Sequence, residues 1–388
     1  MLLGDVIKMT DVFDAFVLLG YAVITHLLLV NFILGLSIII PLMEYYYYKK
    51  NDQDGKKILK NMFKFMILSD LFAGVWATWI TVFLGGFWPS VTYIATTDLF
   101  ASLVIALIGI LIALPSIGIY WFTWDKISEK LHVLIGLFMA IGAIMVASGF
   151  NMIFAFIDDP VGLGSPNYVY KQNSYFSIYS NPLYPDFTLH RIFGALTLVS
   201  LTFAGAYIYS YLKNRNELSK KSAIVFIKIA MISLPIEVLL GFIYSLELIS
   251  NTQYIANQIF WPLLNTSHYN ALSILFIIFI IFIFFMWYLL YYLYFSIDKE
   301  NINKIIPLTL SSLAIITFIL GEFLNDYSRY PYFVITGNTG INASQFINNL
   351  TYLTNIWYIM SYTISLILLI IYIWLINRVI IKNKGIDA

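Results

Sequence analysis

Residues 21–46 read YAVITHLLLVNFILGLSIIIPLMEYY, and Glu44 carries the one carboxylate or ammonium charge among them. A helix rises about 1.5 Å per residue, so this stretch is longer than the roughly 30 Å of hydrocarbon that a spanning helix must cross. Lipid offers no partners to backbone polar groups, and a helix satisfies them internally. The stretch therefore predicts a membrane-spanning helix, and His26 within it is a candidate functional residue.

The composition of the whole chain extends this prediction. Of its 388 residues, 60% are hydrophobic and 11% are charged, and the mean hydropathy is +0.82. These values are typical of a polytopic membrane protein. The net charge of +1 gives no sign of nucleic-acid binding, and the absence of cysteine excludes disulfides, iron–sulfur clusters, thioether-attached haem and blue copper. A metal would have to be held by His, Met or carboxylate side chains.

Nine apolar runs are long enough to cross a bilayer. They lie at 14–46, 61–84, 99–122, 132–156, 189–212, 222–246, 269–296, 306–325 and 353–377. The first run is too long for a cleavable signal peptide. We therefore expect an all-α, polytopic membrane protein with nine transmembrane helices, forming a single membrane-embedded domain over residues 1–388.

The loops between these runs alternate in charge. One set is rich in lysine, for example around 49–60, 126–130 and 213–221, whereas the other set is long, aromatic and nearly free of Lys and Arg. The positive-inside rule places the first set in the cytoplasm. This predicts an N-terminus outside, a cytoplasmic C-terminus and a multi-pass protein of the cell membrane.

Ionisable side chains inside or at the ends of the predicted spans gather toward the lysine-poor side. They are His26, His190, Arg191, Glu237, His268, Glu322, Asp326 and Arg329. Histidine as an axial ligand and arginine for propionates are what a haem requires. Plainer interpretations stay open: Asp326 and Arg329 form a salt bridge at a helix end, and His268 lies in a hydrated loop. The fourth histidine, His132, is interpreted as an interfacial residue at a cytoplasmic helix start.

Four segments of the chain resemble subunit I of cytochrome bd-type quinol oxidases. Residues 121–162 match the stretch between its third and fourth helices, with Trp124-Asp125, Lys130-Leu131-His132 and Asp159-Pro160-Val161-Gly162. Residues 21–46 are similar to the first helix, and residues 190–209 to the fifth. The segment 325–332, NDYSRYPY, resembles the Glu-x-Gly-Arg-Gln-Pro-Trp motif.

The resemblance implies a haem-binding, non-proton-pumping quinol oxidase subunit that passes electrons from the quinone pool to oxygen, reducing it to water. His190 would ligate a low-spin haem b and His26 the haem of the oxygen-reducing site, whether high-spin haem b or haem d. Asp326 stands where a glutamate ligates the high-spin haem b, with Glu322 as a substitute. Arg329 would serve the propionates, and Arg191 and His268 complete the candidate cofactor-binding set. A second multi-helix subunit, either subunit II or a subunit I homologue, is the expected partner.

The sequence also departs from the family pattern. Residues 99–124 lack the two glutamates of the third helix, and the loop between the sixth and seventh spans lacks the quinol-binding motif. The region 269–274 lacks the Met that is the second ligand of the low-spin haem, a role that His268 would fill. Two interpretations stay open: a divergent catalytic subunit, or a non-catalytic paralogue that acts as structural partner of a true subunit I.

Overall fold

The computed structural model describes residues 2–161, 177–260, 271–298, 302–345, 355–376 and 378. Nine helices in these ranges are long and apolar enough to span a membrane, as predicted. The helices and strands are α1 (Leu2–Lys49), α2 (Gln53–Phe87), α3 (Pro89–Thr97), α4 (Phe100–Phe122), α5 (Glu129–Asp158), α6 (Leu183–Asn214), α7 (Glu217–Asn251), α8 (Gln253–Ile259), α10 (Ala271–Ser296), α11 (Ile305–Tyr327), β1 (Tyr332–Thr336), β2 (Thr339–Asn342) and α12 (Asn355–Ile376). At most of the helix ends, the predicted limits of the spans agree with the structure to within a few residues.

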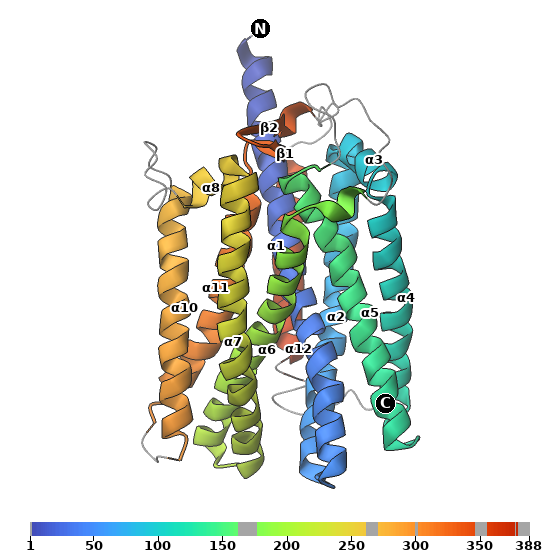
Figure 1. Cartoon of the computed structure of the whole chain (residues 1–388), viewed down its shortest axis with the longest axis vertical. Coiled ribbons are helices and arrows are strands. Elements are labelled where there is room, and N and C mark those ends of the chain that lie inside the picture. Colours follow the sequence, from blue (N-terminus) through green and yellow to red (C-terminus); the bar gives the residue numbers. More distant parts are fainter. Residues whose placement is uncertain are drawn as a thin grey trace.

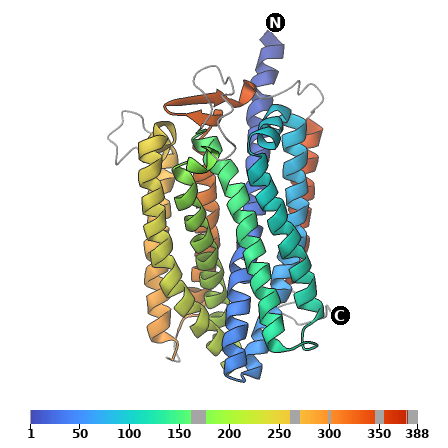
Figure 2. The same cartoon turned by 45° about the vertical axis from the view of Figure 1, so that its right-hand side comes forward.

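The spanning helices run side by side along the long axis of the molecule (Figures 1 and 2). Helix α1 occupies the middle, where it packs against α2, α5, α6 and α11. Within its most apolar stretch 61% of the residues are buried, against 11% for the peripheral α12. Because α1 is surrounded by other helices, its polar side chains face protein rather than lipid.

Helices α4 and α5 approach closely through glycines. A Cβ on Gly109 would lie 2.7 Å from the Gly142 carbonyl oxygen, and one on Gly149 would lie 2.6 Å from the Ser102 carbonyl oxygen. Small residues at such contacts let two helix backbones approach within the membrane. This contact fixes α5, whose last residue, Asp158, belongs to the candidate site below.

Loops and short elements distinguish the two ends of the bundle. The end that carries the α1–α2, α4–α5 and α6–α7 turns is rich in lysine and is called here the lysine-rich end. The opposite, lysine-poor end carries α3, α8 and the β1–β2 ribbon (Figure 1). Which end faces the cytoplasm stays a prediction from the loop charges.

The antiparallel ribbon β1–β2 is an element that the sequence analysis did not predict. Tyr332 pairs with Asn342 and Thr336 with Thr339, and Gly337 in the turn has φ +70°. The Gly337 carbonyl accepts from the backbone N–H of Tyr254 at 3.2 Å, which ties the ribbon to α8. The ribbon therefore holds the segment just after α11, which carries Arg329, against the end of the bundle.

Candidate functional site

His190 lies near the start of α6 and faces α7. Its Nδ1 is 3.2 Å from the Glu237 carbonyl oxygen, and its ring stacks on Tyr244 with centroids 6.3 Å apart. A Cβ on Gly241 would lie 3.0 Å from the His190 ring, so the glycine makes room for the imidazole. Because a carbonyl oxygen only accepts, Nδ1 carries the proton, and Nε2 keeps its lone pair.

His26 repeats this arrangement between α1 and α2. Its Nδ1 is 3.0 Å from the Ala73 carbonyl oxygen, and Tyr21 packs edge-on against Trp76 in the same region with centroids 5.6 Å apart. Again the carbonyl assigns the proton to Nδ1 and leaves the Nε2 lone pair. Metal-ligating histidines typically donate their other ring N–H to a carbonyl or carboxylate, which fixes tautomer and orientation. Both histidines therefore have the hydrogen bonding that an iron ligand requires.

A buried group of charged side chains lies at the lysine-poor end, where α5, α6 and α11 meet. Arg329 donates from Nε and Nη2 to the two carboxylate oxygens of Asp158, at 2.5 and 3.2 Å, and from Nη1 to Asp326 at 3.3 Å. The three residues are 5%, 1% and 7% exposed. The fork-on-fork geometry with Asp158 is the stronger contact because both of its hydrogen bonds are charge-assisted.

Arg191 and Glu322 form the second ion pair of this group, with Nη2 to Oε2 at 2.6 Å. Phe154 links the two pairs, since the guanidinium groups of Arg191 and Arg329 lie 5.4 and 5.9 Å from its ring centroid. The Asp326 Oδ2 and Arg191 Nε atoms are buried without a hydrogen-bond partner. Tyr47 and Trp88 are among the other described residues with such an atom, so these two atoms support a candidate site only together with the charges around them.

Two arginines and three carboxylates therefore share one apolar end of the bundle. Breaking one buried pair leaves an uncompensated charge and costs about 3–5 kcal/mol. With all five groups ionised the set has a net charge of −1, since two positive charges face three negative ones. Asp326 Oδ2 is buried without a hydrogen-bond partner, so this oxygen is a candidate ligand atom.

The structure brings together four of the residues singled out from the sequence: Arg191, Glu322, Asp326 and Arg329. His190 is their neighbour through Arg191, whereas His26 faces α2 and shares no hydrogen bond with the group. His268 lies outside the described residues. The described residues hold no group of three or more His, Asp and Glu side chains suited to a hydrated metal ion. A haem iron needs an axial side chain on at least one face, and His26 and His190 could each supply one.

Asp158 is the site residue that the sequence analysis missed. It is the principal partner of Arg329, so the salt bridge predicted between Asp326 and Arg329 is present but is one arm of a larger network. Two signals pointed toward it: two arginines at a lysine-poor end need carboxylates, and Asp158 continues the buried face of α5 formed by Asn151 and Ala155.

His132 lies near the start of α5 at the lysine-rich end, as predicted, but it is 4% exposed and therefore faces protein rather than headgroups or water. Its Nδ1 is 2.6 Å from a Glu44 oxygen and its Nε2 is 2.9 Å from the Tyr120 carbonyl oxygen. The Tyr120 hydroxyl donates to the other Glu44 oxygen at 2.6 Å. Both ring nitrogens face oxygen acceptors, which suits a doubly protonated ring and leaves no lone pair for a metal.

Comparisons with known proteins agree on one family. A sequence model of the family "Cytochrome bd terminal oxidase subunit I" matches residues 16–254. The "Cytochrome bd ubiquinol oxidase subunit 1" of Bacillus subtilis (strain 168) is 28% identical over 193 residues, which cover 49% of this chain and 41% of that protein. The structure of bd oxidase from Geobacillus thermodenitrificans superposes with a TM-score of 0.85 at 15% identity, covering 96% of this chain and 99% of that chain. The last likeness shows the fold alone.

Proposed function

Because the chain belongs to the cytochrome bd terminal oxidase subunit I family, we propose that it is a haem-binding subunit of a terminal oxidase complex. Electrons would pass from quinol toward oxygen, which is reduced to water. The observation that carries the proposal is the matched anchoring of His190 and His26. Each donates from Nδ1 to a backbone carbonyl of the next spanning helix and keeps the Nε2 lone pair for iron.

His190 is the proposed ligand of a low-spin haem b. Glu237 fixes its ring through the backbone carbonyl, and Tyr244 packs parallel to it at 6.3 Å. His26, oriented by the Ala73 carbonyl, is the proposed ligand of the haem at which oxygen is reduced, either high-spin haem b or haem d. A bound haem would supply one-electron transfer through its iron, and the chain's own residues orient the ligand nitrogens and exclude water.

Asp326 and Glu322 are proposed at the third haem position. Asp326 suits an axial ligand because its Oδ2 is buried and unpaired. The arginines fit less simply, since Asp158 fills the Arg329 fork and Glu322 takes one arm of Arg191. A propionate would bind Arg329 only by displacing a carboxylate of the protein, whereas Arg191 has a buried Nε without a hydrogen-bond partner and would need no such displacement.

A second candidate function is a non-catalytic paralogue that supports a true subunit I, in the place of subunit II. Two observations favour it: α4 contains no Asp or Glu, and the buried arginines are neutralised by the chain's own carboxylates. Both candidate functions require the same membrane location and a partner subunit. The chain is a multi-pass membrane protein, and we propose a plasma-membrane complex with a second multi-helix subunit, the quinone pool and lipid as its partners.

The test is the reduced-minus-oxidised absorption spectrum of the purified complex carrying His190→Ala. We expect loss of the low-spin haem signal with the fold intact, because the substitution removes a ligand and one hydrogen bond to a carbonyl. His132→Ala is the matched control, since both nitrogens of that ring are already bound and the haem spectrum should stay unchanged. An unaltered spectrum of the His190 variant would reject His190 as a ligand.

A separate variant tests whether Asp326 ligates a haem at the proposed third position. Asp326→Asn keeps the shape of the side chain and its weak contact with Arg329, but removes the charge. Loss of one haem per complex with the other haem signals intact supports ligation by Asp326. Full haem content would mean that Asp326 serves only the ion-pair network.

A further inference from the structure

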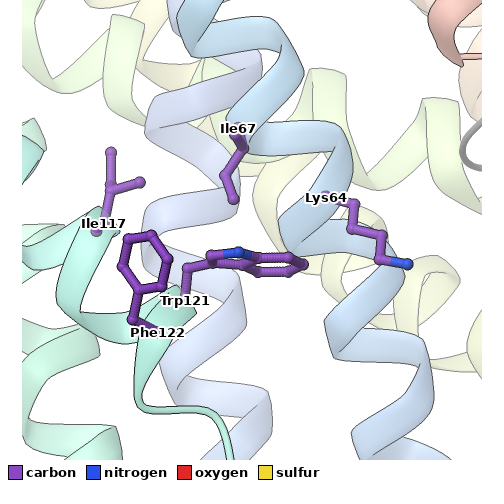
Figure 3. A pocket seen from close by; sticks show the side chains of 6 residues that line it. Lys64, Ile67, Ile117, Trp121 and Phe122 are labelled. Atoms are coloured by element: carbon purple, nitrogen blue, oxygen red, sulfur yellow. The ribbon is translucent and has the colours of Figure 1, made fainter. Parts of the chain in front are cut away.

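A small cavity opens between α2 and α4 near the lysine-rich end (Figure 3). Its volume is about 230 Å³, and it is lined by Lys64, Ile67, Ile117, Gly118, Trp121 and Phe122. Pockets for drug-sized ligands are typically about 300–1,000 Å³, so this cavity suits one flexible chain rather than a ring system. It lies in the bilayer-spanning part of the bundle, and neither the haem proposal nor the buried charge clusters use it.

The depth of the cavity follows from the length of α4. Its 23 residues rise about 1.5 Å each, which matches the hydrocarbon thickness of a bilayer, so its last turn marks the membrane interface. Trp121 and Phe122 form that last turn, and Lys64 lines the cavity beside them. Tryptophan and lysine are the side chains that membrane proteins place at the interface, and Lys64 therefore lies at the level of lipid headgroups.

The lining is layered by polarity along the membrane normal. Helix α2 runs away from the lysine-rich end and α4 runs toward it, so Ile67, Ile117 and Gly118 lie about one helical turn deeper than Lys64 and Trp121. Figure 3 shows the Trp121 ring between Phe122 and Lys64, with Ile67 on its inner side. A Cβ on Gly118 would meet no atom within 4 Å, so the inner part of the groove is open. A ligand that fits is charged at the interface and apolar toward the bilayer centre.

The charge on Lys64 has no carboxylate partner among the described residues. Other lysines of the same end do have one: Lys56 pairs with Glu129, Lys220 with Asp298 and Lys221 with Asp52. Lys64 is half-buried on α2 at the level of lipid headgroups, so its ammonium group is within reach of a lipid phosphate.

We propose that this groove is a binding site for one anionic phospholipid of the leaflet at the lysine-rich end. The Lys64 ammonium pairs with the phosphate, Trp121 supports the glycerol region, and the first part of one acyl chain lies over Gly118 between Ile67 and Ile117. The lipid thereby fills the gap between α2 and α4. The positive charge of Lys64 selects an anionic headgroup, and the open space at Gly118 accommodates the acyl chain.

The test is native mass spectrometry of the delipidated protein, purified with any subunit that accompanies it, titrated with phosphatidylglycerol or phosphatidylcholine. One lysine near a membrane surface contributes about 1 kcal/mol toward anionic lipid, which corresponds to about fivefold in affinity. We expect one phosphatidylglycerol to bind about fivefold more tightly than phosphatidylcholine, and Lys64→Gln to abolish this preference.

Two further variants separate headgroup from chain. Lys228→Gln is the matched control, because Lys228 lies as far from the start of α7 as Lys64 lies from the start of α2, yet does not line the cavity. It should keep the preference. Gly118→Leu places a side chain in the groove, where an added Cβ meets no atom within 4 Å, and should weaken binding of both lipids while Lys64 is intact.

Equal binding of both lipids, or an unchanged preference in Lys64→Gln, would overturn the proposal. So would a loss of the accompanying subunit in Lys64→Gln with lipid adducts unchanged, since the groove would then belong to a protein interface.

Discussion

His190 and His132 lie at opposite ends of the same bundle, and their hydrogen bonds differ in one respect. His190 donates from Nδ1 to a carbonyl and keeps Nε2 free, whereas His132 places both ring nitrogens against oxygen acceptors. A histidine in an apolar helix is a candidate ligand from its position alone. The count of occupied nitrogens distinguishes a ring prepared for iron from a ring that holds helices together.

The charge clusters around the two histidines differ in the same way. At the lysine-rich end every polar side-chain atom of Glu44, His132 and Tyr120 has a partner. At the lysine-poor end Asp326 Oδ2 and Arg191 Nε have none. A complete network stabilises and needs no further group, while an incomplete one costs stability and is retained for another reason. We therefore propose a structural role for the first cluster and keep the second as the candidate functional site.

The largest effect on stability is expected for Asp158→Asn. The substitution leaves the buried Arg329 guanidinium with one neutral amide oxygen in place of the Asp158 carboxylate, and with its 3.3 Å contact to Asp326. We expect a loss of about 3 kcal/mol, the low end for breaking a buried ion pair. Chemical unfolding of the detergent-solubilised protein measures it.

The neighbouring Asp159→Asn is the control for that change. Asp159 is half-buried, and burial, together with the adjacent Asp158 charge, raises its pKa, so a neutral side chain is tolerated there. A change within about 0.5 kcal/mol is expected. The pair Asp158→Leu with Arg329→Met should regain most of the stability lost in Asp158→Asn. If Asp158→Asn proves as stable as Asp159→Asn, the buried pair does not hold this end together.

A smaller loss is expected for His132→Ala. Glu44 would keep its hydrogen bond from Tyr120 but lose its cationic partner, and hydrogen bonds to charged groups are worth about 1.5–3 kcal/mol. We expect a loss of about 2–3 kcal/mol with haem content unchanged, which is the reverse of His190→Ala. Thermal unfolding and the absorption spectrum of both variants provide the check. Loss of haem in the His132 variant would remove the distinction between the two histidines.

The smallest effect concerns Asp52, which joins the α1–α2 turn to the start of α7. A hydrogen bond from the Lys221 ammonium lowers the pKa of Asp52 below its ordinary value. A lowered folded-state pKa adds stability that is complete above the unfolded value, near about pH 4, and is lost as pH falls through the folded one. The pair is partly exposed, so Lys221→Gln should cost under about 1 kcal/mol at pH 7 and less at pH 2.5. An equal cost at both pH values, measured by thermal unfolding, would contradict this linkage.

The spanning helices were predictable because each is a long apolar run, and lipid permits hardly any other backbone structure there. The β1–β2 ribbon was not predicted, because it lies in a polar loop, and the search for long apolar runs does not apply to such a loop. Its turn at Gly337, followed by Asn338, is a hairpin signal of the ordinary kind. Rules for membrane-spanning segments predict the helices inside the bilayer, and they predict nothing about the loops beyond the membrane interfaces.

The type of each candidate residue and its depth in the membrane were predictable from the sequence. The side chains that each one contacts were not. His190, Arg191, Glu322, Asp326 and Arg329 stand out because charged groups are costly in lipid. That Arg329 would bind Asp158 rather than chiefly Asp326 depends on the rotation of α5 about its axis and on its glycine contacts with α4. The Glu44–His132 pair spans 88 residues of sequence, and nothing local in either segment indicates it.

The most direct test of the account is the haem content of this chain purified alone and with its partner subunit, by haem extraction and a reduced-minus-oxidised spectrum. We expect haem on the lone chain, with a low-spin component that disappears in His190→Ala and persists in His132→Ala. A colourless chain, with all of the haem in the partner, would contradict it. The anchored histidines would then be structural, and the chain a non-catalytic paralogue.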